Sequence, residues 1–261
     1  MKLRQLLLNK YSISVLILLL LLGTDMLLHK GMTRVMISSN FNEYAISSIE
    51  PCEHTITVSG KEWIKGVNTL EQMQALADAP GMETDVYFDK EKMEFFVYHD
   101  SSKISSLTLD SLLSLNHKVN SIWLDFKNLD DSNNISALQK LKEVRQQFNK
   151  KILVESPNAK ALQIFCANDF PTIYYTPFFN PYTDTESQTR AFSDSISRYL
   201  KSYPASAMSG YYFQYPILKH NFPAYPVLTW SEKHSASAVS YFLNRQMMRD
   251  TSVKIILYSQ E

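Results

Sequence analysis

The chain has 261 residues, and its 26 Lys and Arg balance 26 Asp and Glu, so its formal net charge is zero. Hydrophobic residues make up 45% and charged residues 20%, which is an ordinary globular composition. This composition excludes a disordered charged chain, a collagen-like chain and a multi-span membrane protein. It gives no support to a nucleic-acid partner, which usually requires a basic excess. The length allows one large domain or two small ones.

The first thirty residues have the features of a membrane signal. An apolar run over 13–22 is interrupted by Gly23-Thr24-Asp25, and it is preceded by three basic residues, Lys2, Arg4 and Lys10. We predict a basic tail at 1–10 and an uncleaved transmembrane signal anchor at 11–30, close to the length of about 20 residues that a span requires. A cleavable signal peptide is the alternative, but no small-x-small cleavage site follows.

This anchor would make the chain a single-pass membrane protein. The basic residues ahead of the span predict a cytoplasmic N-terminus. The rest of the chain would then lie outside the cytoplasm, in a periplasmic, extracellular or lumenal space.

A polar linker is predicted at 31–53 and a single domain at 54–261, in which strand-like and helix-like segments alternate. Strands are expected at 63–67, 82–88, 94–99, 121–127, 151–155, 172–176, 207–213, 225–230 and 253–258. Helices are expected at 69–79, 109–115, 135–148, 159–167, 186–203 and 235–249. The alternation favours a mainly parallel sheet covered by helices. The predicted fold class is therefore α/β, a single (β/α)₈ barrel of the TIM type, preceded by a membrane-anchor helix.

Nine strands are one too many for such a barrel. Only four polar residues, 89–92, separate the second strand from the third, which is too short for a crossover helix and predicts a hairpin. With its turn centred on Glu91, Glu83 would lie opposite His99, and Asp85 opposite Val97. Glu83, Asp85 and His99 would then share one face.

Asp125 and Lys127 are two residues apart on another predicted strand with apolar neighbours, so their charges require partners. If Glu83, Asp85 and Asp125 converge, their carboxylates repel one another unless a cation compensates them. Magnesium suits a few carboxylates together with a substrate phosphate. Lys127 could stabilise an anionic transition state, and His99 could serve as a general acid or base.

Several segments, taken in order, resemble the phospholipase-C-like phosphodiesterase superfamily. They are Gly66-Val67-Asn68-Thr69, Met82-Glu83-Thr84-Asp85-Val86-Tyr87-Phe88-Asp89, Val97-Tyr98-His99 and Trp123-Leu124-Asp125-Phe126-Lys127. Sphingomyelinase D-type enzymes and the menorin family are the nearest likenesses, and glycerophosphodiester phosphodiesterases are more distant. Further on, Val227-Leu228-Thr229-Trp230 resembles the late strand of these barrels that ends in a tryptophan.

The resemblance implies a TIM barrel with its site at the carboxyl ends of the strands. It implies Mg²⁺, with Ca²⁺ as the alternative, held by Glu83, Asp85 and Asp125. Lys127 would lie beside the phosphate of a phosphodiester substrate. His99 would be one of two catalytic histidines and would protonate the leaving group.

The sequence departs from the family at Lys65, where the first histidine is expected. A lysine with its usual pKa of about 10.4 is protonated and cannot accept a proton. Three interpretations remain open: Lys65 acts as an electrostatic clamp in altered chemistry, His54 supplies the missing imidazole, or the domain keeps binding and has lost catalysis.

Four further residues are candidates for substrate binding: Asn68, Glu155, Tyr175 and Trp230. The two cysteines, Cys52 and Cys166, are consistent with a disulfide in an exported domain or with two free thiols. The sequence thus predicts a membrane-anchored, metal-dependent phosphodiesterase that acts on a lipid headgroup or an envelope glycan. The alternative is a catalytically impaired barrel that binds a phosphate ligand or serves as a scaffold.

Overall fold

The computed structural model describes residues 2–28, 48–53, 56–76, 79–115, 119–180, 184–231 and 238–259. The strands are β1 (Glu62–Lys65), β2 (Met82–Asp89), β3 (Glu94–Val97), β4 (Ser121–Phe126), β5 (Lys151–Ser156), β6 (Thr172–Tyr175), β7 (Ala207–Tyr211), β8 (Val227–Trp230) and β9 (Val253–Ser259). The helices are α1 (Lys2–Leu28), α3 (Leu70–Ala75), α4 (Leu109–Leu113), α5 (Asn134–Phe148), α6 (Ala159–Cys166), α7 (Glu186–Ser202), α8 (Tyr215–Asn221) and α9 (Ala238–Arg249).

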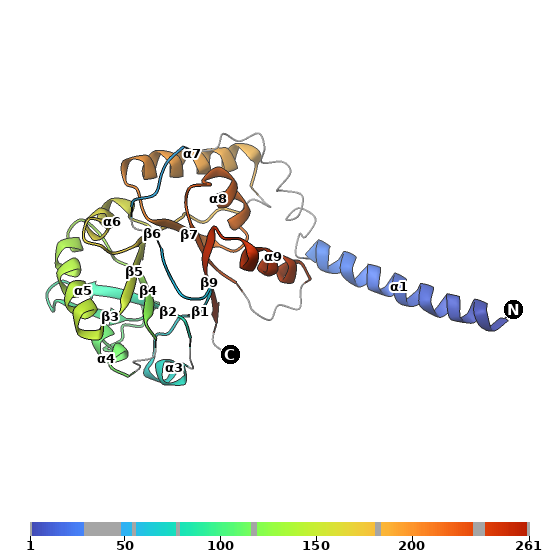
Figure 1. The fold of residues 1–261 in the computed structure, drawn as a ribbon, viewed down its shortest axis with the longest axis horizontal. Coiled ribbons are helices and arrows are strands. Elements are labelled where there is room, and N and C mark those ends of the chain that lie inside the picture. Colours follow the sequence, from blue (N-terminus) through green and yellow to red (C-terminus); the bar gives the residue numbers. More distant parts are fainter. Residues whose placement is uncertain are drawn as a thin grey trace.

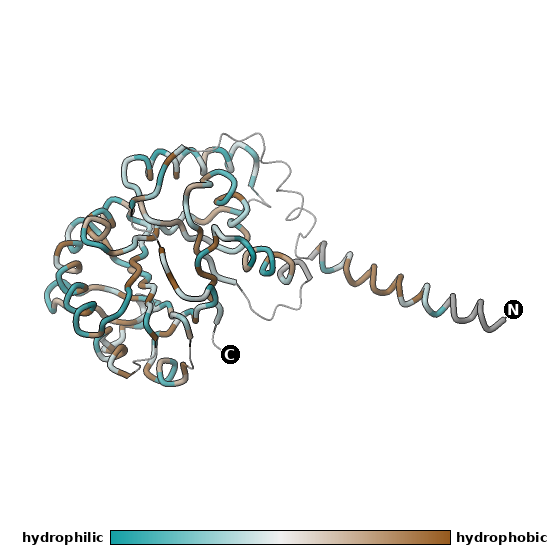
Figure 2. The backbone as a smooth tube through the Cα atoms, in the orientation of Figure 1, coloured by the Kyte–Doolittle hydropathy of each residue, from teal (hydrophilic) through white to brown (hydrophobic). Residues whose placement is uncertain are grey.

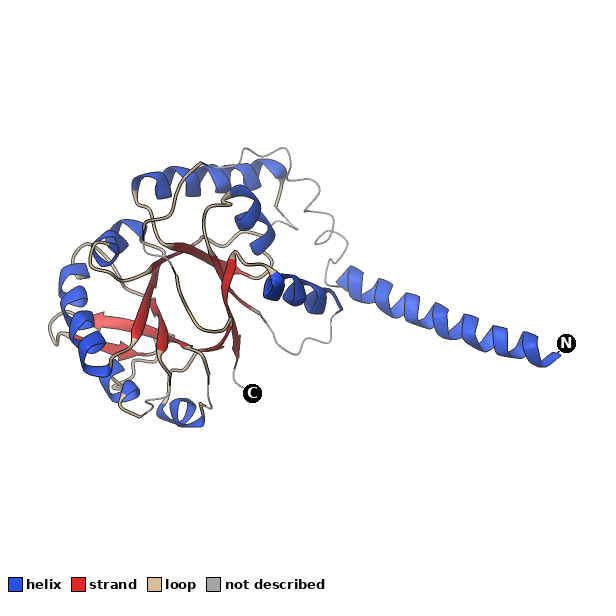
Figure 3. Ribbon diagram, in the orientation of Figure 1, coloured by secondary structure: helices blue, strands red, loops and turns tan. Residues whose placement is uncertain are grey.

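Eight parallel strands close into a barrel, with helices around the outside (Figures 1 and 3). The strands follow the order β1-β9-β8-β7-β6-β5-β4-β2, and β1 also pairs with β2 to close the ring. The predicted (β/α)₈ barrel is therefore confirmed. Helix α8 was not predicted, because it is short and has a proline in its first turn.

The two faces of each strand bury different residues, as the two-residue period of a strand requires. Outward side chains pack against the helices. A separate hydrophobic cluster fills the inside of the barrel: Ile56, Trp63, Trp123, Leu153, Ile173, Ala207, Leu228, Ile255 and Leu257. Two residues further along, the same inward face changes from apolar to polar at Lys65, Asp125 and Glu155. The barrel thus has an apolar floor, and polar groups lie at the carboxyl ends of the strands.

The extra strand forms the predicted hairpin, since β3 pairs antiparallel with β2 alone. The predicted register is wrong by one residue, because Val97 lies opposite Val86 and not opposite Asp85. The turn contains four residues, 90–93, and Met93 adopts a left-handed conformation with φ of 55°. The Asp89 carboxylate caps this turn by accepting hydrogen bonds from the backbone N–H groups of Glu91 and Lys92.

Helix α1 covers most of the predicted basic tail and of the predicted anchor, and it projects from the barrel with its carboxyl end near α9 (Figure 1). The predicted anchor is wrong: within the described residues, no helix has an apolar stretch long enough to cross a membrane. The uninterrupted run over 13–22, coloured as hydrophobic in Figure 2, extends only about 15 Å at a rise of 1.5 Å per residue. A bilayer core measures about 30 Å. The single-pass membrane topology predicted from this segment is wrong with it.

The chain ahead of β1 is joined to the barrel through a disulfide. Cys52 is bonded to Cys166 at the end of α6, so the two thiols are not free. Most of the predicted linker at 31–53 lies outside the described residues.

Candidate active site

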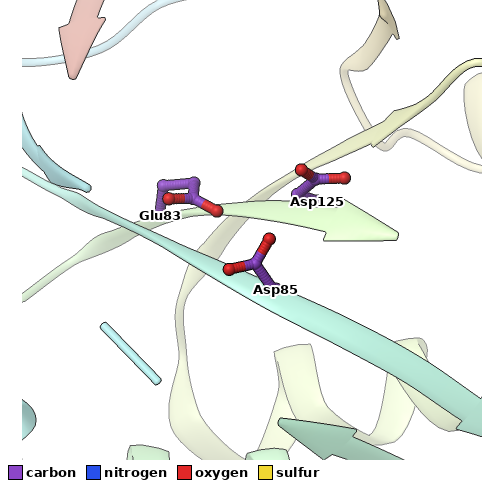
Figure 4. A group of neighbouring side chains, drawn as sticks. All are labelled: Glu83, Asp85 and Asp125. Atoms are coloured by element: carbon purple, nitrogen blue, oxygen red, sulfur yellow. The ribbon is translucent and has the colours of Figure 1, made fainter. Parts of the chain in front are cut away.

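Three carboxylates from the neighbouring strands β2 and β4 converge. Glu83 and Asp85 come from β2 and share a face because they are two residues apart, and Asp85 lies beside Asp125 of β4 in the parallel register. One oxygen from each of the three lies within 4.8 Å of the others, and Figure 4 shows the side chains directed toward one another. Glu83 and Asp85 are both only 4% exposed. The structure therefore brings together the three predicted metal ligands.

Lys127 and Asn68 hold this cluster in place. The Lys127 ammonium lies 2.7 Å from Asp85 Oδ1 and 2.5 Å from Asp125 Oδ2. The Asn68 amide donates to Asp85 Oδ2 at 2.6 Å, and its oxygen accepts from the Asp85 backbone N–H at 2.9 Å. Asn68, predicted to bind substrate, is thus placed to orient a carboxylate.

Burial and like charge control the protonation of Glu83. Burial, followed by the charges of the neighbouring Asp85 and Asp125 carboxylates, raises the pKa of Glu83 to about 8, against a smaller opposing effect of the Gly66 N–H and Lys127. That N–H donates to Glu83 Oε2 at 2.6 Å. Gly66 has φ of 69°, a left-handed conformation that glycine adopts without strain.

Burial and neighbouring charges have opposing effects on the pKa values of Asp125 and Lys127. Burial raises the pKa of Asp125, although the charges of Lys127 and His99 lower it. Burial lowers the pKa of Lys127, but the attraction of Asp125 and Asp85 outweighs it, so the net pKa is raised. Lys127 therefore remains an ammonium ion across the physiological pH range.

Glu155 lies beside Asp125 in the parallel register of β4 and β5 and is only 3% exposed. Burial, followed by the charge of Asp125, raises the pKa of Glu155 well above its ordinary value. The Trp123 indole N–H donates to Glu155 Oε2 at 2.9 Å, and the Ser209 hydroxyl donates to Oε1. Glu155, predicted to bind substrate, thus has both carboxylate oxygens engaged by protein donors, and one of these donors, Ser209, was missed. Ser209 and Tyr211 are two residues apart on the strand predicted at 207–213, and this spacing could have placed Ser209 on the inward face.

Three more of the predicted residues, Lys65, Tyr175 and Trp230, form a second group around the Trp230 ring. Trp230, at the end of β8, lies with its ring centroid 5.6 Å from that of Tyr175 and 4.8 Å from that of Tyr211. The ammonium of Lys65, an exposed residue at the end of β1, lies 5.5 Å from the centroid of the Trp230 ring. Burial raises the pKa of Tyr175, and Tyr211 and the charges of Glu155 and Asp125 raise it further.

His99 follows β3 in an exposed loop, near enough for its charge to act on Asp125. It does not share the strand face with Glu83, because the register differs from the predicted one. His54, the candidate for a second imidazole, lies outside the described residues.

The cluster fits a hard divalent cation. Carboxylate oxygens are the ligands that Mg²⁺ and Ca²⁺ prefer, at about 2.0–2.1 Å and 2.3–2.6 Å respectively. Two oxygens on opposite sides of one such ion are therefore about 4–5 Å apart, and the oxygens of Glu83, Asp85 and Asp125 fall within this limit. These three residues could hold the ion, while Lys127 compensates part of their charge.

No family model matches the sequence, and no curated protein matches it either. The structure, in contrast, is similar to a glycerophosphodiester phosphodiesterase from Parabacteroides distasonis ATCC 8503. The TM-score is 0.52 and the sequence identity is 14%, and the match covers 76% of this chain and 94% of that one. This chain shares the barrel fold of that phosphodiesterase. The resemblance that the ordered motifs indicate is thereby confirmed at the level of the fold.

A second similar structure is a calcium-dependent phosphoinositol-specific phospholipase C from a Gram-negative bacterium, Pseudomonas sp. Its TM-score is 0.46 and its identity is 9%, and the match covers 81% of this chain and 91% of that one.

Proposed function

We propose that the domain at 54–261 is a metal-dependent phosphodiesterase. The observation that best supports this proposal is the convergence of the Glu83, Asp85 and Asp125 carboxylates within 4.8 Å, beside the Lys127 ammonium. The carboxylates alone would repel an anionic phosphodiester. A bound divalent cation, together with Lys127, would provide the positive charge that such a substrate requires.

Each side chain has a part in this proposal. Glu83, Asp85 and Asp125 hold Mg²⁺ or Ca²⁺, which polarises a phosphoryl oxygen when bound. Lys127, fixed by its two ion pairs, stabilises the charge that grows on the phosphoryl oxygens. A water molecule or a hydroxyl group of the substrate forms the new bond to phosphorus and releases its proton to solvent. As the bond from phosphorus to the leaving-group oxygen breaks, His99 donates a proton to that oxygen, so that the alcohol departs neutral. The phosphodiester belongs to a lipid headgroup or to a glycan linked through phosphate.

Lys65 favours a second candidate, a domain that binds a phosphate ligand without turnover. Its ammonium, 5.5 Å from the centroid of the Trp230 ring, stands at the strand end where the resemblance implies a histidine. A positive charge at this position attracts a phosphate group but does not remove a proton from an attacking oxygen.

Hydrolysis tests both candidates. The purified chain is assayed with bis-p-nitrophenyl phosphate, a glycerophosphodiester and a glycosyl phosphodiester, with Mg²⁺ or Ca²⁺ and after chelation by EDTA. We expect metal-dependent product release from the wild type. Asp85→Asn removes a ligand charge and should lower turnover by about 100-fold or more, as losses of central electrostatic groups do.

Asp131→Asn is the matched control. Asp131 is also paired with a lysine, Lys160, but its side chain is 55% exposed, and we expect full activity from this variant. Full turnover in Asp85→Asn would refute the metal role. Phosphate binding by calorimetry, without hydrolysis of any of the three compounds, would establish the second candidate in place of the first.

A further inference from the structure

The β2–β3 hairpin extends beyond the barrel. One of its faces is the continuation of the β2 face that carries the acidic cluster. Asp85, Tyr87 and Asp89 alternate along β2, so they point to the same side, and Phe96 lies directly opposite Tyr87. The Tyr98 backbone N–H donates to the Asp85 carbonyl at 3.2 Å, which extends this pairing by one residue and brings Tyr98 to the same face. The opposite face, including Val86 and Val97, is buried in the core.

A cavity of about 540 Å³ lies on this continued face. We call it the hairpin pocket, and its lining includes Tyr87, Asp89, Lys92, Phe96, Tyr98 and Asn128. Its volume falls within the range of about 300–1,000 Å³ that is typical of small-molecule sites. Tyr87 and Tyr98 stack with their ring centroids 4.2 Å apart and their planes inclined by only 4°. The pocket therefore offers planar aromatic surfaces beside hydrogen-bonding groups.

The hairpin pocket lies close to the proposed reaction centre, which is the group of carboxylates that includes Asp85. Two residues along a strand extend about 6.6 Å, which is the advance from Asp85 to Tyr87. His99 directly follows Tyr98 in the chain. A ring joined to a phosphate at the carboxylates would therefore reach the two tyrosines.

The charges of the pocket indicate the kind of ring. The Lys92 ammonium lies 5.0 Å from the centroid of the Phe96 ring and 3.4 Å from Asp89 Oδ2, so a cation of the chain already occupies this aromatic and carboxylate environment. A cationic headgroup would meet a like charge there, and an anionic group would meet Asp89. An uncharged ligand avoids both repulsions.

We propose that the hairpin pocket binds an uncharged sugar ring attached to the scissile phosphate. The C–H face of a sugar packs on aromatic rings, whose faces carry partial negative charge. Its hydroxyl groups are hydrogen-bonded by Asp89, Lys92 and the tyrosine hydroxyls, which offsets their loss of water. This assignment rests on the proposed phosphodiesterase function and selects a glycosyl phosphodiester as its substrate.

Binding of simple sugars tests the pocket without turnover. Methyl glucoside and methyl N-acetylglucosaminide are titrated into the full chain, with choline chloride as a cationic comparison, and dissociation constants are measured by ligand-observed NMR. We expect both sugars to bind the wild type. Tyr98→Ala should weaken them about tenfold, because an aromatic stacking surface is lost. Tyr98→Phe keeps the ring and should bind within about threefold of the wild type, which guards against a folding defect in Tyr98→Ala.

Two more variants test whether sugar binding depends on the aromatic ring and the charge of the hairpin pocket. Tyr241→Ala removes an equally large aromatic ring from the exposed surface of α9, where Tyr241 is 56% exposed, and should leave sugar binding unchanged. Lys92→Ala removes the cation of the pocket and should permit choline to bind. The proposal is overturned if neither sugar binds the wild type, if Tyr98→Ala binds them normally, or if choline binds the wild type more tightly than the sugars do.

Asp85→Asn separates this proposal from the proposed function, since it should lose hydrolysis and keep sugar binding. If the expected binding pattern is found but no phosphodiester is hydrolysed, the pocket stands and the phosphodiesterase function fails. If hydrolysis is found but Tyr98→Ala leaves KM for a glycosyl phosphodiester unchanged, the pocket fails and the function stands.

Discussion

Glu83 illustrates at the scale of one residue how burial sets the conditions for metal binding. Burial and two neighbouring carboxylates raise its pKa to about 8, so below that pH it holds a proton that a cation must displace. The affinity for Mg²⁺ or Ca²⁺ should therefore rise by up to about tenfold per pH unit from pH 6 to pH 8, and then level off. Calorimetric titration in buffers of different ionisation enthalpy measures both the affinity and the released proton.

Glu83→Gln is the control for this prediction, because it cannot release a proton, and its weaker metal binding should vary much less with pH. An affinity of the wild type that is constant between pH 6 and pH 8 would contradict the assignment. The same proton affects folding: between its unfolded pKa near 4.5 and about 8, the folded metal-free chain binds more protons than the unfolded chain. The stability of the metal-free protein should thus fall as pH rises through this window.

Single residues also show the limits of prediction from sequence. The acidic residues and Lys127 were found because charged side chains interrupt an apolar strand at two-residue spacing. Asn68 and Ser209 were not given their roles, because amide and hydroxyl groups are common in loops and strands. Only the fold shows that they contact Asp85 and Glu155.

At the scale of the element, Gly81 allows β2 to start against the floor of the barrel. A Cβ atom at Gly81 would lie 2.4 Å from the Trp63 ring, which is buried and cannot move aside easily. Gly81→Ala should therefore lower the free energy of unfolding by about 1–3 kcal/mol, as overpacking usually does. Urea unfolding followed by circular dichroism measures this loss.

Gly23→Ala is the matched control for that substitution. A Cβ atom at Gly23 meets nothing within 4 Å, so this variant should unfold like the wild type or slightly later. Equal stability of Gly81→Ala and Gly23→Ala would show that the Trp63 ring yields at little cost.

The hairpin shows why an element can be predicted while its register is not. Four polar residues between two strands are enough to predict the turn. The register of β2 and β3 also depends on Met93, whose left-handed conformation lengthens the turn. Methionine has no preference for that conformation, so the sequence contains no signal for it.

At the scale of the whole molecule, the barrel depends on the seam between β1 and β9. The backbone N–H of Ile256 donates to the Lys61 carbonyl at 2.7 Å across this seam. Ile256→Pro removes the donor from a central strand and should cost about 3 kcal/mol or more of the free energy of unfolding. Ile256→Val keeps the N–H and should cost only about 0.5–1.5 kcal/mol. Thermal unfolding of both variants compares them, and an equal loss would mean that the seam contributes little.

The alternation of strands and helices was sufficient to predict the barrel, because parallel neighbours need crossover helices and these fix the strand order. The N-terminal helix was a different case. Its apolar run and basic flank suggested a span, but the uninterrupted run is about half as long as a bilayer core is thick. Length in ångströms, and not hydrophobic character alone, decides that question.

The seam also affects how the protein is made. Glu62 of β1 pairs with Ile256 of β9, so its partner is translated about 190 residues later. At about 5–20 residues per second, the ribosome takes roughly 10–40 s to cover that distance. During this interval β1 has one unpaired edge, and the ring stays open until β9 has emerged. Closure is therefore the last step in forming the barrel, and the nascent chain needs protection from strand-to-strand aggregation until β9 arrives.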